Sequence, residues 1–227
     1  MPLPVARQST DQIHRALRDA ILSARMKPGE AISEARMAVQ FAVSRTPVRE
    51  AFKRLAEEGF LEVVPQVGTF VARIDLAAVY DSQFVRETLE CRMIVLACEQ
   101  ADEAQRRELA GLVDRQAQAL ERGDREEFFR LDEAFHATVS HLAGHASVWN
   151  LIESVKAQLD RVRCLSLESP GWSEMILREH RDIAERVASA DAGGAEAAMR
   201  AHLRTVFDAI ETIARDHVDA FARAEER

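Results

Sequence analysis

The sequence predicts a mainly α-helical protein with two domains: an N-terminal winged helix-turn-helix (three helices plus a β-hairpin) followed by an all-α helical bundle. Apolar residues recur at helical spacing over most of the 227 residues, and strand-like runs are confined to residues 60–73. The composition, with 47% hydrophobic residues, 30% charged residues and only 9 Gly, is that of a helix-rich globular protein. We place the domain boundary near residue 74, giving domains 1–74 and 75–227.

The first domain begins with two helices that carry their own start signals. The run Ser-Thr-Asp-Gln at residues 9–12 reads as a capping box, in which a serine and a glutamine satisfy backbone amides reciprocally. The helix that follows ends before the Lys-Pro-Gly of residues 27–29. Ser33 can cap a second, short helix that runs through Phe41.

The third helix, which ends at Gly59, has two different faces. Its apolar residues repeat with the spacing of a buried face: Val48, Ala51, Phe52 and Leu55. Its basic residues fall on another face: Arg45, Arg49 and Lys53. Ser44 or Thr46 can cap this helix, and Pro47 is tolerated in its first turn. Guanidinium groups near a helix N-terminus suit the phosphates and base edges of a DNA major groove.

Two β-rich runs follow, at residues 60–64 and 69–73, and flank the Pro-Gln-Val-Gly turn of residues 65–68. A hairpin of this size is marginal alone, so we expect it to pack on the three helices. Its tip would then lie beside the DNA.

From Asp75 onward the strand pattern disappears and helical spacing continues to the end of the chain. We expect six helices, separated by short polar or glycine-containing breaks. Their approximate ranges are 76–101, 103–122, 125–143, 146–167, 173–190 and 195–223.

The charge distribution supports DNA binding by the first domain and not by the second. Residues 1–74 carry 11 Lys and Arg against 8 Asp and Glu, a net charge of +3, although the whole chain carries −8. The acidity therefore belongs to the second domain. Because attraction to phosphate is screened over about 8–10 Å, a basic face can bind DNA beside an acidic domain.

Four polar residues interrupt the apolar faces of the bundle. Asp132 and His136 are four residues apart on one helix, His180 stands in an apolar stripe, and His202 lies on the inward side of the last helix. If they converge, three imidazoles and a carboxylate suit a divalent transition metal: zinc, nickel or manganese. The alternative is a set of separate core histidines, with Asp132 paired to an arginine.

Other features limit the function classes. The three cysteines form no CxxC pair and are expected to be buried, reduced thiols. The first ten residues are not a signal peptide, and no apolar run approaches the roughly 20 residues needed to span a bilayer, so we expect a cytoplasmic location without membrane contact. No HExxH motif, phosphate loop or nucleophile signature is present, so we do not expect an enzyme.

The residues Val-Ser-Arg-Thr-Pro-Val-Arg-Glu-Ala at 43–51, with Leu55, Gly59 and the Gly-Thr-Phe-Val of residues 68–71, resemble the winged-helix domain of GntR-family bacterial transcription regulators. The helical part, with Asp132-x-x-x-His136, the Glu-His-Arg around His180, and His202, is similar to that family's FCD-type C-terminal domain. Together the two resemblances cover nearly the whole chain.

The resemblance implies a homodimer on a palindromic operator of double-stranded DNA. It also implies a divalent metal, zinc above all with nickel or manganese as alternatives, held by Asp132, His136, His180 and His202. The implied DNA contacts are Arg36, Arg45, Thr46, Arg49 and Gly68 at the wing tip. The implied effector is a small organic or sugar acid that touches the metal.

The resemblance is incomplete in the first domain. The wing carries Gln66 and Val67 where a basic residue is usual, and the turn before the third helix has Phe41 and Ala42 in place of the usual leucine and glycine. We therefore expect more of the DNA recognition to fall on the third helix.

The leading hypothesis is a ligand-responsive transcription regulator. Arg86 is a candidate partner for the effector carboxylate, and the alternative is a surface arginine paired with Glu90 four residues on. Two other readings of the chain are a small metal-dependent enzyme tethered to DNA and a regulator whose bundle only dimerises.

Overall fold

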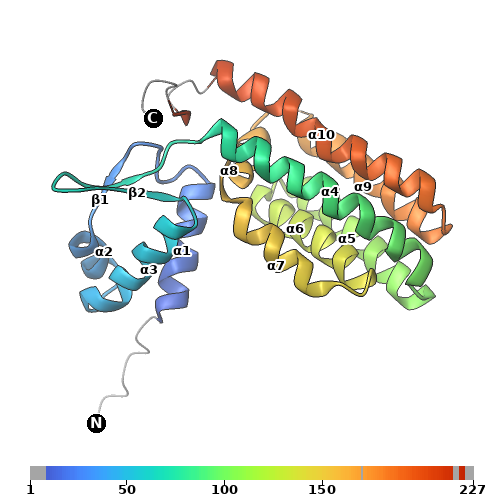
Figure 1. Ribbon diagram of the computed structural model, residues 1–227, viewed down its shortest axis with the longest axis horizontal. Helices are drawn as coiled ribbons and strands as arrows, with labels where there is room; N and C mark the ends of the chain where they lie inside the picture. Colours follow the sequence, from blue (N-terminus) through green and yellow to red (C-terminus); the bar gives the residue numbers. More distant parts are fainter. Residues whose placement is uncertain (1–8, 170, 217–219, 223–227) are drawn as a thin grey trace, which may run out of the picture. The chain divides into compact units, whose positions relative to one another are not determined.

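The computed structural model describes residues 9–169, 171–216 and 220–222. These residues form two compact units (Figure 1). One contains the residues up to Leu76 together with those from Ala214 onward, and the other is Ala77–Ile213. We call the first the winged unit and the second, after the role proposed for it below, the sensor unit. The mainly α-helical architecture with a small sheet confirms the predicted fold class.

The described residues of the winged unit form three α-helices, α1 (Thr10–Leu22), α2 (Glu34–Gln40) and α3 (Arg45–Glu57). The predicted capping box at the start of α1 is present, because Ser9 and Gln12 bond each other's backbone amides. Ser33 caps α2 by accepting from the amide of Arg36. Gly59, with φ +77°, follows α3 in the left-handed conformation that ends many helices.

The predicted apolar face of α3 is the centre of this unit's core. Val48, Ala51 and Leu55 are fully buried, and Phe52 is nearly so. Helices α1 and α2 pack on α3, and their residues Ile13, Leu17 and Met37 are buried as well. The basic face of α3 is left in contact with solvent.

The predicted hairpin is β2 (Leu61–Val64) and β3 (Gly68–Val71), but the sheet has a third strand. β1 (Ala31–Ile32) pairs with β3, so the antiparallel order is β1-β3-β2. A strand of two residues leaves no alternating pattern in the sequence, which is why it was missed. Gln66 sits at the wing tip with φ +63°.

A short C-terminal segment belongs to the winged unit. Ile74 donates its amide to the carbonyl of Ala220 and accepts from the amide of Ala222, forming a parallel bridge with Phe221. Ile74, Ala220 and Phe221 are all buried.

In the part of the chain that the structure describes, the sensor unit contains seven helices. Their bounds are α4 (Leu76–Gln100), α5 (Glu103–Glu121), α6 (Arg125–Leu142), α7 (Ala146–Val155), α8 (Ala157–Ser166), α9 (Trp172–Ala188) and α10 (Ala192–Asp216). Helix α5 packs on α6 and α9, and α10 lies along α4, where the side-chain amide of Gln83 donates to the carbonyl of Leu203 (Figure 1). A single apolar core fills the space between them, with Phe128, Leu131 and Phe135 near its centre.

Two predicted helices were wrong in their extent. The expected helix 146–167 is divided at Lys156, whose buried ammonium group pairs with Glu133 and with Asp160. The expected helix 195–223 ends as an α-helix at Asp216, and residues 220–222 instead form the bridge to Ile74; residues 217–219 and 223 lie outside the described part of the chain. Within the described residues, none of the helices combines the length and apolarity that crossing a bilayer requires.

Candidate metal centre and DNA-binding helix

Three histidines from three helices converge inside the sensor unit. His136 of α6, His180 of α9 and His202 of α10 are each buried, and one donor atom from each lies within 4.8 Å of the other two. The Nε2 atom of His202 is 3.2 Å from Nε2 of His180 and 3.3 Å from Nε2 of His136. Four nitrogen or oxygen donors around zinc at 2.0–2.1 Å lie about 3.3 Å apart, so these two separations fit a common metal ion.

The other nitrogen of each ring faces a side-chain oxygen. Nδ1 of His180 is 2.8 Å from the side-chain oxygen of Gln116, and Nδ1 of His202 is 2.8 Å from Glu179. Nδ1 of His136 is 2.5 Å from Glu90. For His180 and His202, this acceptor holds the proton on Nδ1 and leaves the Nε2 lone pair free, which is the usual second shell of a metal-bound histidine. Glu90 faces Nδ1 of His136 as an ion-pair partner and not as a hydrogen-bond acceptor.

Electrostatics favour the neutral form of all three rings. Burial lowers the pKa of His136, and it lowers the pKa of His180 and His202 well below the ordinary value, where neighbouring histidines add to the effect. With the proton on Nδ1 in each neutral ring, the three Nε2 lone pairs face one another and repel unless a cation lies between them. The donor chemistry of the cluster therefore fits a divalent metal.

Asp132 lies at the edge of this cluster. Its carboxylate oxygens are 3.7 Å from Nε2 of His180 and 3.9 Å from Nε2 of His136. The same carboxylate is paired with the guanidinium of Arg163 on α8. Asp132 thus combines the two arrangements that the sequence left open, a place beside the histidines and an arginine partner.

Arg86 is buried, not on the surface as one of the alternatives held. Its Nε donates to Glu90 at 2.6 Å, as the four-residue spacing predicts. Burial disfavours its charge, but the carboxylate of Glu90 more than compensates and raises the pKa of Arg86 above its ordinary value. One terminal nitrogen, NH2, has no hydrogen-bond partner among the described residues.

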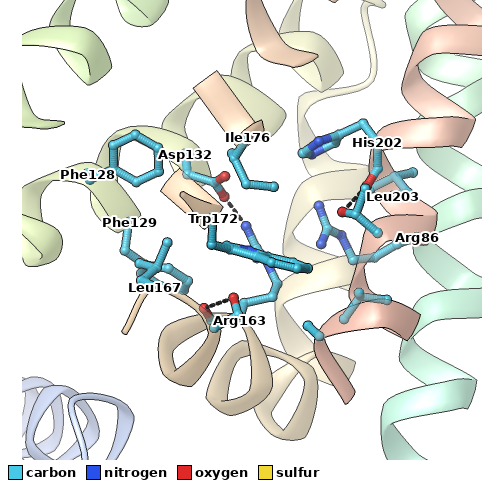
Figure 2. A pocket seen from close by; sticks show the side chains of 14 residues that line it. Arg86, Phe128, Phe129, Asp132, Arg163, Leu167, Trp172, Ile176, His202 and Leu203 are labelled. Carbon is cyan, nitrogen blue, oxygen red and sulfur yellow. Dashed lines mark hydrogen bonds and ion pairs between the residues drawn. The ribbon is translucent and has the colours of Figure 1, made fainter. Parts of the chain in front are cut away.

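A cavity of about 40 Å³ lies beside the histidine cluster. Its polar lining includes Arg86, Asp132, Arg163 and His202. Figure 2 shows Arg86 and His202 on one side of this cavity and the aromatic rings of Phe128 and Phe129 on the opposite side. The cavity can therefore hold a small anionic group at one side and apolar atoms at the other.

Sequence reasoning missed most of the residues around the metal centre. Glu90 was considered only as a partner of Arg86, and Arg163 was not singled out. Glu179 and Glu90 could have been found from the sequence, because Glu179 directly precedes His180 and Glu90 lies four residues after Arg86. Gln116 lies 64 residues from His180 in the chain, and nothing in the sequence connects the two.

The basic residues predicted to read DNA lie on the surface of the winged unit. Arg45 and Thr46 occupy the first turn of α3 and Arg49 the second, and all three are exposed. Ser44 is the N-cap residue, but its side chain makes no capping hydrogen bond, so the first-turn amides of α3 are not bonded by it. Anionic groups are stabilised at such a helix start.

Arg36 and Gly68 lie outside α3. Arg36 is on α2, with 58% of its side chain exposed and Glu30 3.7 Å away. Gly68 is exposed at the first position of β3, directly after the wing turn. The wing tip carries Gln66 and Val67 directly before Gly68, so neither of the two residues before this glycine is basic.

Comparisons with protein-family models match both units. Residues 9–71 match the family described as bacterial regulatory proteins of the gntR family, and residues 81–205 match the FCD domain. The chain belongs to the GntR family. It is a DNA-binding transcription regulator of the GntR/FCD type, which confirms the resemblance and the expectation that it is not an enzyme.

Individual relatives agree with this assignment. The chain is 40% identical to an HTH-type transcriptional regulator in an unstable DNA locus of Streptomyces ambofaciens, over 95% of this chain and 91% of that protein. It is 36% identical to the HTH-type transcriptional repressor RspR of Escherichia coli, over 93% and 92% of the two chains. Among solved structures, McbR/YncC of E. coli has the same fold, with a TM-score of 0.76 at 21% identity over 89% of this chain and 97% of that one.

Proposed function

We propose that this regulator senses a small organic or sugar acid at a metal centre in its sensor unit and binds a palindromic operator as a homodimer. The observation that carries the proposal is the convergence of three histidine Nε2 atoms beside a cavity lined by a buried, incompletely bonded arginine. Buried polar groups cost stability unless they are paired, so folding alone does not explain a cluster of three buried histidines.

The metal would be held by His136, His180 and His202, with Asp132 as the fourth protein ligand. Zinc is the first choice for three imidazoles and a carboxylate, with nickel and manganese as alternatives. Such an ion supplies a Lewis acid that accepts a carboxylate or hydroxyl oxygen. Glu90, Gln116 and Glu179 orient the three rings from behind.

The acid would be recognised by Arg86. Its free NH2 group is buried at the cavity, and a carboxylate would supply the missing acceptor. Arg163, which also lines the cavity, adds a second positive charge. A cavity of about 40 Å³ suits a compact acid of a few heavy atoms, and Trp172 and Phe128 would contact its carbon skeleton.

The winged unit would read the operator through α3. Arg45 and Arg49 are the proposed base or phosphate readers, Arg36 a second base or backbone contact, Thr46 a phosphate contact, and Gly68 allows the wing to approach the duplex. Because a homodimer presents two copies of α3 related by a twofold axis, its operator would be palindromic.

Metal analysis followed by a calorimetric screen tests the sensing part of this proposal. Purified protein should contain about one zinc, nickel or manganese ion per chain, and one or more small hydroxy or sugar acids should bind and change its affinity for operator DNA. If the protein contains no stoichiometric metal and a chelator leaves its stability unchanged, the bundle only dimerises. The pairing of Asp132 with Arg163 favours this second candidate function, a regulator whose sensor unit only dimerises.

A further inference from the structure

A carboxylate lies directly beside one of the proposed DNA-reading arginines. Glu34, at the first position of α2, is 3.3 Å from Nε of Arg49 on α3. The two side chains are 33% and 66% exposed, so neither is buried in the core of the unit. An exposed ion pair of this kind adds little stability, so stability does not explain its position on this surface.

The atoms that make the contact leave the reading edge of Arg49 free. Glu34 accepts a hydrogen bond from Nε only, and the two terminal nitrogens of Arg49 have no hydrogen-bond partner among the described residues. A guanidinium presents two parallel N–H donors to guanine O6 and N7 when it reads a base pair. Holding Nε therefore fixes the plane of the group without consuming the donors needed for bidentate contact.

The backbone of Glu34 is fixed by the start of helix α2. Ser33 caps α2, which places Glu34 in the first turn of a helix that packs on α3. The carboxylate thus comes from a different helix than the arginine it holds.

The negative charge also affects binding to phosphate. The first 74 residues carry a net charge of only +3, and Glu34 lies on the surface that would face the duplex. Binding to DNA of any sequence depends on the number of phosphates that the protein neutralises. A carboxylate on this surface weakens such binding, and only a duplex that supplies the correct base contact offsets the loss.

We propose that Glu34 is a positioning and specificity-determining residue: it orients Arg49 for base reading and penalises binding that uses phosphates alone. The proposal rests on the proposed role of Arg49 as a DNA reader. It assigns Glu34 no contact with a base.

The test compares Glu34→Gln with the wild type in the full-length protein. Affinities are measured by fluorescence anisotropy for a duplex selected from a random pool by the wild type and for a random duplex, at several salt concentrations. We expect the selected-to-random affinity ratio to fall about tenfold, as random-DNA affinity rises. We also expect the slope of log affinity against log salt to steepen by about 0.9, because the released arginine gains a phosphate.

A matched control is Glu57→Gln at the other end of α3, where Glu57 is exposed and 3.8 Å from Lys53. This variant should leave the ratio unchanged. Glu34→Asp keeps the charge but shortens the side chain by one methylene. It should therefore lower the selected-to-random affinity ratio without steepening the slope of log affinity against log salt. It serves as the test if Glu34→Gln does not fold.

The decisive measurement repeats Glu34→Gln in an Arg49→Ala background at low salt. Because Glu34 acts through Arg49, the substitution should then leave the ratio unchanged. The same drop in that background would mean that Glu34 reads a base directly and would overturn the proposal. An unchanged ratio for Glu34→Gln in the otherwise wild-type protein, or for Glu34→Asp where that variant is the test, would also overturn the proposal. If Arg49→Ala alone does not weaken DNA binding, the proposed role of Arg49 as a DNA reader is refuted instead.

Discussion

Zinc should stabilise the sensor unit, and His202→Asn should remove most of that stabilisation. Asparagine can still donate to Glu179 from the position of Nδ1, but it has no atom in the place of Nε2. The Nε2 separations of 3.2 and 3.3 Å already fit zinc, so binding needs little rearrangement of these rings. The substitution therefore tests the metal site with little disturbance of the surrounding contacts.

The size of the effect follows from binding linkage. Free zinc at 100 times its dissociation constant stabilises the folded state by about 2.7 kcal/mol. For a unit of this length that raises the unfolding temperature by about 10 °C. If losing one ligand weakens binding by about 100-fold, the same zinc concentration contributes only about 0.4 kcal/mol, and the shift falls to about 1–2 °C.

The assay is thermal unfolding followed by circular dichroism, with chelator and then with zinc, nickel or manganese. His141→Asn is the matched control, because His141 is an exposed histidine on α6 and should leave the full shift in place. Equal shifts in the His202→Asn variant and the wild type, or no shift in the wild type with any of these ions, would refute the reasoning. The histidines would then be a structural cluster.

Four further outcomes are expected. Arg49→Ala should weaken binding to the selected duplex by about 5- to 150-fold in fluorescence anisotropy, with unfolding unchanged. Arg86→Lys keeps a charge beside Glu90 but loses the guanidinium fork, so calorimetry should show at least about tenfold weaker acid binding while zinc binding persists. In metal-free protein, the free energy of unfolding should decrease as the pH drops below about 6.5, because His180 binds a proton in the unfolded chain but stays neutral where it is buried. In His180→Asn, urea titrations should show a free energy of unfolding whose slope against pH is smaller by about 1.4 kcal/mol per pH unit. Ala42→Gly should add about 1 kcal/mol in urea unfolding, since Ala42 has φ +53°.

The elements that the sequence predicted well are those whose signals are local. The capping residues of α1 and α2, the apolar face of α3 and the left-handed Gly59 each follow from neighbouring residues, and the structure has them where the pattern places them. The three histidines were also visible, because a polar residue in an apolar stripe interrupts a regular pattern.

The parts that could not be predicted depend on contacts between distant segments. The break at Lys156 follows from buried carboxylates on α6 and α8, and a lysine in a helical sequence gives no sign of such burial. Strand β1 exists only because β3 offers it an edge. Gln116 orients His180 across 64 residues of chain, and an isolated glutamine has no spacing that marks it as part of a metal site.

The bridge between Ile74 and Phe221 makes the sensor unit an insertion within the winged unit. The chain leaves the winged unit just after Ile74 and returns to it through α10, the helix that carries His202. A protein cut after residue 216 would lose this bridge, so the buried side chain of Ile74 would be exposed and its amide and carbonyl would lose their partners Ala220 and Ala222.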